Sequence, residues 1–228
     1  MRGAKTAVKK TRVLIVDDHP MTRAGLVHVI NHQPDLTVCG EAESAARALD
    51  ILDSSRPDLL LIDITLPGKS GLELIKDVKA MRPELLMLVI SMHDESLYAD
   101  RVLRAGARGY ITKHEGGEKL MEAIRHVLRG KIYVSESMSA HILEIFSGGQ
   151  TGLDRSSIEK LSDREFEVFE ALGEGLSSQR IAKKLHLSAK TVDAHRANIK
   201  TKLNIKTTAE LIAYAARWTS HRRIGNSG

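Results

Sequence analysis

The chain has 228 residues, 42% of them hydrophobic and 28% charged, a composition that is typical of soluble globular proteins and excludes an extensively disordered one. Its length favours two domains, because a typical domain contains about 100–150 residues. Apolar runs are far shorter than the roughly 20 residues that cross a bilayer, and the single cysteine, Cys39, excludes an internal disulfide. We therefore expect a cytoplasmic protein with no membrane partner.

The formal net charge of +5 is distributed unevenly along the chain. Residues 1–12 contain five basic residues and no acid, which favours an unstructured basic tail over residues 1–11 rather than a nucleic-acid arm. Residues 13–160 contain 17 basic and 22 acidic residues, whereas residues 161–228 contain 12 basic and 7 acidic ones. Concentrated positive charge suits a polyanion, because neutralised phosphates release their counterions. The C-terminal part is therefore suited to nucleic acid.

From residue 12 to about 130, short apolar runs alternate with longer segments of helical periodicity. This alternation predicts a parallel sheet with crossover helices. We expect strands at 13–16, 36–39, 59–62, 85–90 and 109–111. We expect helices at 20–31, 43–52, 71–81, 95–104 and 117–129. The predicted fold is α/β, flavodoxin-like and doubly wound, with the strand order 2-1-3-4-5.

Acidic residues follow two of the expected strands directly. Asp17 and Asp18 come after the first strand, and Asp63 comes after the third. In the order 2-1-3-4-5 these strands are neighbours, and ligands bind at the carboxyl ends of such strands. Three converging carboxylates repel one another unless a hard cation offsets their charge, and Mg²⁺ prefers such oxygen ligands. Each acid by itself could equally be an ordinary turn residue.

These residues resemble the receiver domain of two-component response regulators over about residues 12–130. Asp17 and Asp18 resemble its acidic pair, and the segment from Asp63 to Gly68 with Gly71 resembles its phosphoacceptor loop. The resemblance implies that Asp63 accepts a phosphoryl group from a histidine kinase. It also implies that Mg²⁺ is held by Asp17, Asp18, Asp63 and the backbone carbonyl of Thr65.

The same resemblance assigns three further residues around the phosphoacceptor. Ser91 matches the switch hydroxyl, Tyr110 the switch aromatic residue and Lys113 the phosphate-binding lysine. On phosphorylation, Ser91 would bond a phosphoryl oxygen and leave space for Tyr110 to turn inward. His19, His93 and His114 lack the spacing of a transition-metal site, and we expect them to be loop residues. An effect of His93 on dephosphorylation remains open.

A connector is expected at residues 131–160. Apolar residues between 136 and 146 recur at helical spacing, and residues 147–152 read Ser-Gly-Gly-Gln-Thr-Gly. The first segment predicts a short helix and the second a linker that lets the domains reorient.

Helix-start signals recur after residue 160. Ser162 with Glu165 and Thr207 with Glu210 have capping-box spacing, and Ser177 and Ser188 are suited to N-caps. They predict four helices in a domain at 161–218, followed by a tail at 219–228. The helix to Leu185, the turn at 186–188 and the next helix to Leu203 have the proportions of a helix-turn-helix.

This domain resembles the LuxR-type helix-turn-helix of NarL/FixJ-family regulators, on Leu161 to Glu165, Ile181-Ala182, Lys190 to Arg196 and Lys202-Leu203. The resemblance implies binding of double-stranded DNA as a homodimer. Lys190, Thr191, Lys200 and Lys202 are the candidates for phosphate contacts. Asp193, Ala194, Arg196 and Ala197 are the candidates for base edges, although Asp193 could merely orient Arg196. His195 is more readily explained as a packing or capping residue than as a base reader.

The sequence therefore predicts a phosphoprotein that regulates transcription and is not an enzyme. A solvated basic face on a protein-interaction domain is the plain alternative for the C-terminal part. An aspartyl-phosphate phosphotransferase or hydrolase usually carries an acid two residues after its nucleophile, where this chain has Thr65. A transcription factor that works independently of phosphorylation is a third possibility.

Overall fold

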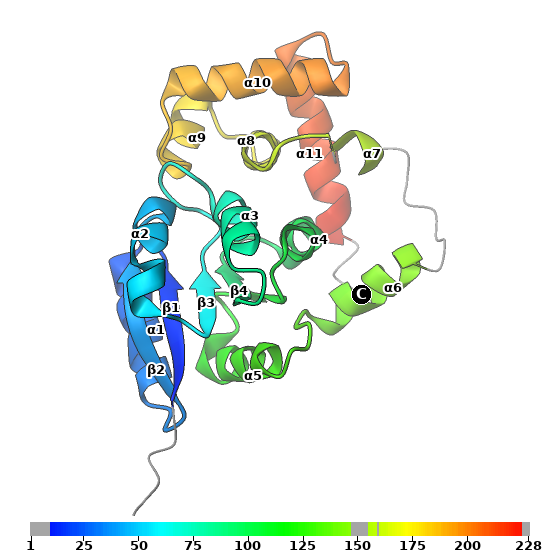
Figure 1. Ribbon diagram of the computed structural model, residues 1–228. Helices are drawn as coiled ribbons and strands as arrows, with labels where there is room; N and C mark the ends of the chain where they lie inside the picture. Colours follow the sequence, from blue (N-terminus) through cyan, green and yellow to red (C-terminus); the bar gives the residue numbers. More distant parts are fainter. Residues whose placement is uncertain (1–9, 147–154, 159, 225–228) are drawn as a thin grey trace, which may run out of the picture.

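The computed structural model describes residues 10–146, 155–158 and 160–224 (Figure 1). Nearly all of the expected basic tail, and the expected linker at 147–152, lie outside the described residues. None of the described helices is long and apolar enough to cross a membrane.

Strands and helices alternate in the first half of the chain, which we call the sheet domain. Its strands are β1 (Thr11–Val16), β2 (Leu36–Ala42), β3 (Leu59–Ile62), β4 (Leu86–Ser91) and β5 (Gly109–Thr112). Its helices are α1 (Pro20–Asn31), α2 (Ala45–Ser55), α3 (Gly71–Met81), α4 (Glu95–Ala105) and α5 (Gly116–Leu128). The strands pair in parallel in the order β2-β1-β3-β4-β5, which confirms the predicted fold class.

The two faces of the sheet are covered by different helices (Figure 1). Val13 and Ile15 of β1 pack in a core with residues of α1 and α5. Leu14 and Val16 point to the other face and pack with residues of α2, α3 and α4. Alternate side chains of a strand point to opposite faces, so a strand covered on both sides is apolar at every position. The unbroken apolar runs in the sequence have this cause.

The remaining helices are α6 (Glu136–Phe146), α7 (Arg155–Ile158), α8 (Asp163–Gly173), α9 (Ser178–Lys184), α10 (Ala189–Leu203) and α11 (Thr208–Ile224). We call α8 to α11 the helical domain. Ser162 and Glu165 form the predicted capping box, and Ser177 and Ser188 accept from backbone N–H groups as N-caps. Thr207 and Glu210 form the second predicted box through reciprocal hydrogen bonds.

Helix α11 continues six residues into the segment from residue 219 that was predicted to be a tail. Thr219 is only 4% exposed, and its hydroxyl donates to the carbonyl of Ala215. A Cβ on Gly173 of α8 would come within 2.8 Å of atoms of Ala215 and Thr219, so the two helices approach closely there. Packing on α8 therefore extends the helix. The single turn α7 within the expected connector was not predicted either.

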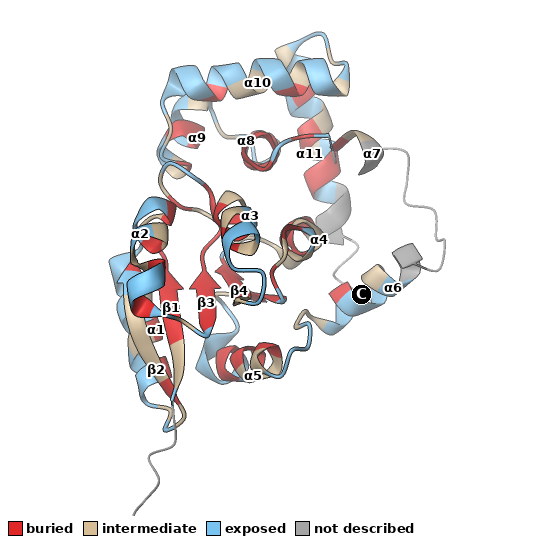
Figure 2. Ribbon diagram, in the orientation of Figure 1, coloured by how far each residue is buried: buried red, intermediate tan, exposed pale blue. Residues whose placement is uncertain are grey.

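The helical domain rests on α3 and α4 of the sheet domain (Figures 1 and 2). Buried residues of α3 and α4 belong to the same hydrophobic cluster as Phe166, Phe169 and Trp218 of the helical domain. Arg101 of α4 lies over the ring of Phe166, with its guanidinium carbon 4.1 Å from the ring centroid. This docking places the helical domain beside the carboxyl ends of the strands.

Candidate functional sites

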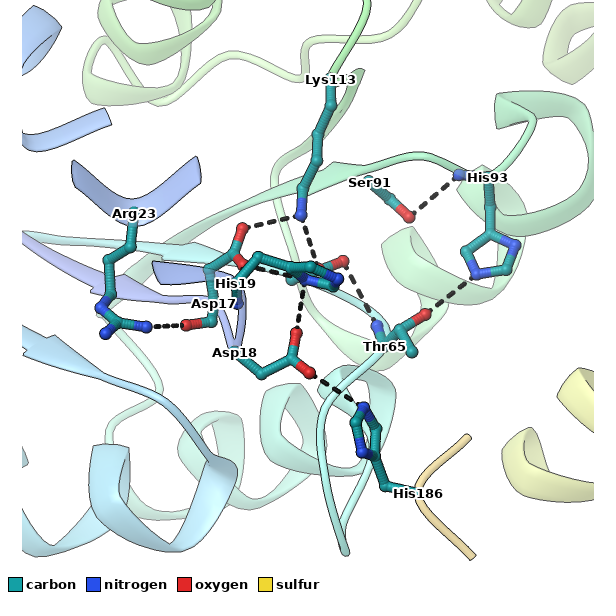
Figure 3. Close-up of polar contacts among 10 residues, drawn as sticks. Asp17, Asp18, His19, Arg23, Thr65, Ser91, His93, Lys113 and His186 are labelled. Carbon is teal, nitrogen blue, oxygen red and sulfur yellow. Dashed lines mark hydrogen bonds and ion pairs between the residues drawn. The ribbon is translucent and has the colours of Figure 1, made fainter. Parts of the chain in front are cut away.

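The register of the sheet brings the predicted acids together. Val16 of β1 is the partner of Ile62 of β3, so Asp17 and Asp63 follow paired residues. The backbone N–H of Asp63 donates to the carbonyl of Val16 at 2.8 Å. Ligand atoms of Asp17, Asp18, His19 and Asp63 all lie within 4.8 Å of one another (Figure 3). The structure therefore brings the three predicted carboxylates into one cluster.

Lys113 joins two of these acids. It follows β5, and its Nζ donates to Asp17 Oδ2 at 2.7 Å and to Asp63 Oδ2 at 2.6 Å (Figure 3). Burial raises the pKa of Asp63, against the lowering effect of the Lys113 charge. Burial would lower the pKa of Lys113, but the charges of Asp63 and Asp17 outweigh it and raise that pKa. An ammonium group beside the Asp63 carboxylate is suited to an incoming phosphoryl group.

The donor set fits a hard divalent cation. Asp17 and Asp63 are 0% and 3% exposed. His19 Nδ1 lies 2.7 Å from Asp18 Oδ1, but this buried oxygen accepts no hydrogen bond. Clustered carboxylate oxygens, one of them without a hydrogen bond, are suited to Mg²⁺, which keeps water and phosphate oxygens as its other ligands. The second oxygen of Asp18 is 3.0 Å from Nε2 of His186, in the turn between α9 and α10.

A glycine shapes the loop after Asp63. A Cβ on Gly71 would lie 2.1 Å from the carbonyl oxygen of Asp63, so only glycine fits where α3 begins. The N–H of Gly71 donates to the Ile64 carbonyl, and Ser70 with Glu73 forms a capping box at the start of α3. The Thr65 N–H lies 3.3 Å from Asp63 Oδ1. The loop from Asp63 to Gly71 is thus fixed at both ends.

The two predicted switch residues lie on the neighbouring strands. Ser91 ends β4, and its hydroxyl accepts from the His93 N–H at 3.2 Å (Figure 3). Tyr110 of β5 is 1% exposed, and its hydroxyl donates to the His93 carbonyl at 2.8 Å. The Tyr110 side chain is therefore already inward in this structure, whereas the family resemblance implies that it turns inward on phosphorylation.

His93 is more than the loop residue expected from the sequence. Its Nε2 lies 3.0 Å from Thr65 Oγ1, and its Nδ1 lies 3.2 Å from Oε2 of Glu170 in α8. Burial would lower the pKa of His93, but the hydrogen bond and charge of Glu170 outweigh it and raise that pKa. No sequence motif marks Glu170, because its partner is far away in the chain.

Most of the predicted DNA-contacting residues lie on the exposed side of α10 (Figure 2). Those that are exposed are Lys190, Thr191, Asp193, Ala194, Ala197 and Lys202. Arg196, Lys200 and His195 are half-buried. Lys202 donates to Glu165 of α8 at 2.6 Å, which engages it within the helical domain.

Asp193 and Arg196 lie together. Arg196 Nη1 is 3.3 Å from Asp193 Oδ1 and also donates to the Ser178 hydroxyl at the start of α9. That hydroxyl donates to Asp193 at 2.9 Å. This arrangement is the one expected if Asp193 orients Arg196 instead of contacting a base.

An interdomain cavity of about 660 Å³ lies in front of Asp63. The sheet domain contributes Asp63, Thr65, His93 and Lys113 to its lining. The helical domain contributes Glu170, Glu174, Arg180, Lys183, Lys184 and His186. The end of the sheet that carries Asp63 thus faces the helical domain.

Comparison with known families covers both domains. Residues 13–125 match the family described as "Response regulator receiver domain". Residues 159–215 match the family described as "Bacterial regulatory proteins, luxR family".

Relatives and solved structures match over most of the chain or over about three fifths of it. The chain is 35% identical over 211 residues to the oxygen regulatory protein NreC of Staphylococcus carnosus, covering 90% of this chain and 97% of that protein. It also resembles the structure of RcsB from Salmonella enterica serovar Typhimurium bound to the promoter rprA with the phosphomimetic BeF3⁻. That likeness has a TM-score of 0.61 and 27% identity over 91% of this chain and 99% of the other. A LuxR-family two-component response regulator from Aurantimonas sp. matches with a TM-score of 0.57 and 32% identity, over 61% of this chain and 99% of that one.

Proposed function

Because the chain belongs to the NarL/FixJ family of two-component response regulators, which are DNA-binding transcription regulators, we propose that it is phosphorylated on Asp63 and binds DNA through α10. The observation that carries this proposal is the cluster of Asp17, Asp18 and Asp63 with the ammonium group of Lys113. We assign residues 12–130 to the receiver, 131–160 to the connector and the residues from 161 to the DNA-binding domain.

Phosphoryl transfer assigns a separate task to each polar residue. An Asp63 carboxylate oxygen bonds to the phosphorus of the donor's phosphohistidine, the phosphorus–nitrogen bond breaks, and the imidazole leaves. Lys113 offsets charge on the transferred group, and Ser91 bonds one of its oxygens. Asp17, Asp18, Asp63 and the Thr65 carbonyl would hold Mg²⁺, which when bound offsets further negative charge.

The proposed partners are a sensor histidine kinase, double-stranded DNA and a second copy of the chain. One solved structure of RcsB is described as two dimers bound to two parallel DNAs, and a dimer matches a two-fold DNA site geometrically. Since bacterial DNA lies in the cytoplasm, we place the protein there. Thr65 stands where an aspartyl-phosphate hydrolase carries an acid, which supports a regulator rather than an enzyme.

Phosphate labelling tests the acceptor assignment. The full chain is incubated with labelled acetyl phosphate and Mg²⁺, and we expect label that Asp63→Asn abolishes and EDTA prevents. Asp53→Asn, at the 79%-exposed partner of Arg82, is the matched control and should label as the wild type does. Label on the Asp63→Asn protein would place the acceptor elsewhere.

A further inference from the structure

Four parts of the molecule contact a single residue, His93. The hydroxyl of Ser91 at the end of β4 accepts from its backbone N–H, and the hydroxyl of Tyr110 on β5 donates to its carbonyl. Thr65, two residues after the phosphoacceptor, bonds its Nε2. Glu170 of the helical domain bonds its Nδ1. Within the described chain, His93 therefore connects the loop of Asp63 and both switch residues with the helical domain.

We propose that His93 is the positioning residue that couples the phosphoacceptor site to the helical domain, by holding Glu170 when Asp63 is unmodified and releasing it when Asp63 is phosphorylated. This inference rests on the proposed function. It concerns the pair His93–Glu170 rather than the phosphorylation chemistry.

The contacts of Glu170 explain how the pair His93–Glu170 affects docking of the helical domain on α4. Glu170 is 2% exposed, and its Oε2 accepts from the Tyr98 hydroxyl of α4 as well as lying 3.2 Å from His93. The rings of His93 and Tyr98 are also in contact, with centroids 4.8 Å apart. A buried carboxylate that loses one of its two partners costs free energy until water reaches it. Release of His93 therefore favours separation of α8 from α4.

The contacts of His93 also explain why phosphorylation would move it. In the unmodified protein the Ser91 hydroxyl oxygen points to the His93 N–H and accepts a hydrogen bond from it. When that hydroxyl turns to a phosphoryl oxygen, the backbone of His93 loses one of its two anchors. The Thr65 loop shifts at the same time, because it carries the modified Asp63, and the imidazole loses the contact that sets its orientation.

Trp218 provides a natural reporter of domain separation. It is the only tryptophan of the chain, it is 8% exposed, and it makes edge contacts with Phe166 and Phe169. Together with Leu97 and Arg101 of α4 it lines a second cavity between the domains. When α8 leaves α4, acrylamide should reach this indole more readily.

The first measurement is acrylamide quenching of Trp218 in the full chain, with and without Mg²⁺ and BeF3⁻. We expect BeF3⁻ to increase quenching in the wild type. Glu170→Gln should be quenched more strongly without BeF3⁻ and change little when it is added. His93→Gln provides a second, independent variant with the same expected result, and far-UV circular dichroism checks that both are folded. Quenching that stays at the wild-type value in both folded variants would overturn the proposal.

The second measurement separates coupling from a merely structural role. Linkage is reciprocal, so a variant that releases the helical domain should bind BeF3⁻ more tightly, and typical couplings are about 5–150-fold. We expect Glu170→Gln to tighten BeF3⁻ binding at least about fivefold. Glu174→Gln is the matched control, because Glu174 lines the same cavity and pairs with Lys184 at 2.8 Å. An equal gain in both variants would show a simple charge effect and contradict the proposal.

The acetyl phosphate labelling separates a failure of the proposed role of His93 from a failure of the proposed function. If Asp63 is labelled but BeF3⁻ leaves quenching of Trp218 unchanged, the role of His93 is wrong while the proposed function stands. If label remains on the Asp63→Asn protein, the proposed function itself fails.

Discussion

The helical domain has charged residues on two surfaces, which are exposed to solvent on one and buried on the other. The outer side of α10 presents the charged residues Lys190 and Asp193 to solvent, whereas α8 buries five charged residues, each at most 7% exposed. These five are Asp163, Arg164, Glu165, Glu167 and Glu170. Figure 2 shows the contrast, with α8 red and α10 largely pale blue. The domain is closed toward the receiver while much of its proposed DNA-binding surface stays exposed.

The partners of the buried charges explain how the closed side holds together. Lys76 donates to Asp163 at 2.6 Å, and Arg164 donates to the Gly68 carbonyl at 2.6 Å. The receiver supplies both of these partners. Contacts of this kind add little net free energy, because desolvation of the charged groups offsets much of the attraction, so an interface between domains that is built on them is reversible. The proposed release of α8 would therefore change where α10 can be placed on DNA rather than uncover α10.

The largest expected effect is a loss of stability at the centre of the closed side. Phe166 is 1% exposed and touches Tyr98, Arg101 and Trp218. Phe166→Ala should lower the free energy of unfolding by about 3–5 kcal/mol, because it leaves a cavity where aromatic packing was. Urea denaturation followed by circular dichroism measures it. A loss below about 1 kcal/mol would mean that the buried side tolerates substitution as well as the exposed side of α10 does, and the contrast between the two surfaces would not hold.

The next effect is a pH dependence that arises on the same side. Burial raises the pKa of Glu167 from 4.5 to about 7, although Arg164 opposes the shift. Between these values the folded protein binds a proton that the unfolded chain releases, so stability falls as pH rises from about 4.5 to 7. Over this range the free energy of unfolding should fall by something on the order of 3 kcal/mol, since each unit of pKa shift is worth about 1.36 kcal/mol.

Glu167→Gln tests this dependence. The variant should lose less stability than the wild type between pH 5 and pH 8 in urea denaturation. Glu210→Gln, at the capping box of the exposed end of α11, is the control and should keep the wild-type slope. Parallel curves for Glu167→Gln and wild type would show that this carboxyl group is not the source.

The sequence predicted the parts whose cause is local. Periodicity located every strand and the helices of the receiver, and capping serines located the starts of α8, α9 and α10. Strand order then placed Asp17 beside Asp63. The docking of the domains was not predictable in this way, because His93 and Glu170 meet across separate domains and neither has a motif. The extension of α11 also depends on a contact with α8, which no local propensity encodes.

A smaller effect is expected at the half-buried Arg196 of α10. Its guanidinium is held by Asp193 and Ser178, so it is oriented before DNA arrives. Arg196→Ala should cost about 1–3 kcal/mol of binding at the preferred DNA site and less at other sequences, if it reads a base edge. Binding titrations on a selected and a scrambled duplex measure the difference. Equal losses on both duplexes would reduce Arg196 to a phosphate contact.

The smallest effect is expected at Lys190, at the start of α10. Its side chain is exposed, so Lys190→Ala should change the free energy of unfolding by no more than about 0.5 kcal/mol. If it touches a phosphate, its removal should weaken binding to all sequences alike and reduce the slope of log K against log salt by about one. Lys69→Ala, on the receiver surface, is the control and should keep the wild-type slope, since that lysine pairs with Asp77. If the salt slope of Lys190→Ala equals that of the wild type, Lys190 does not contact a DNA phosphate, and its charge at the start of α10 does not have the proposed role.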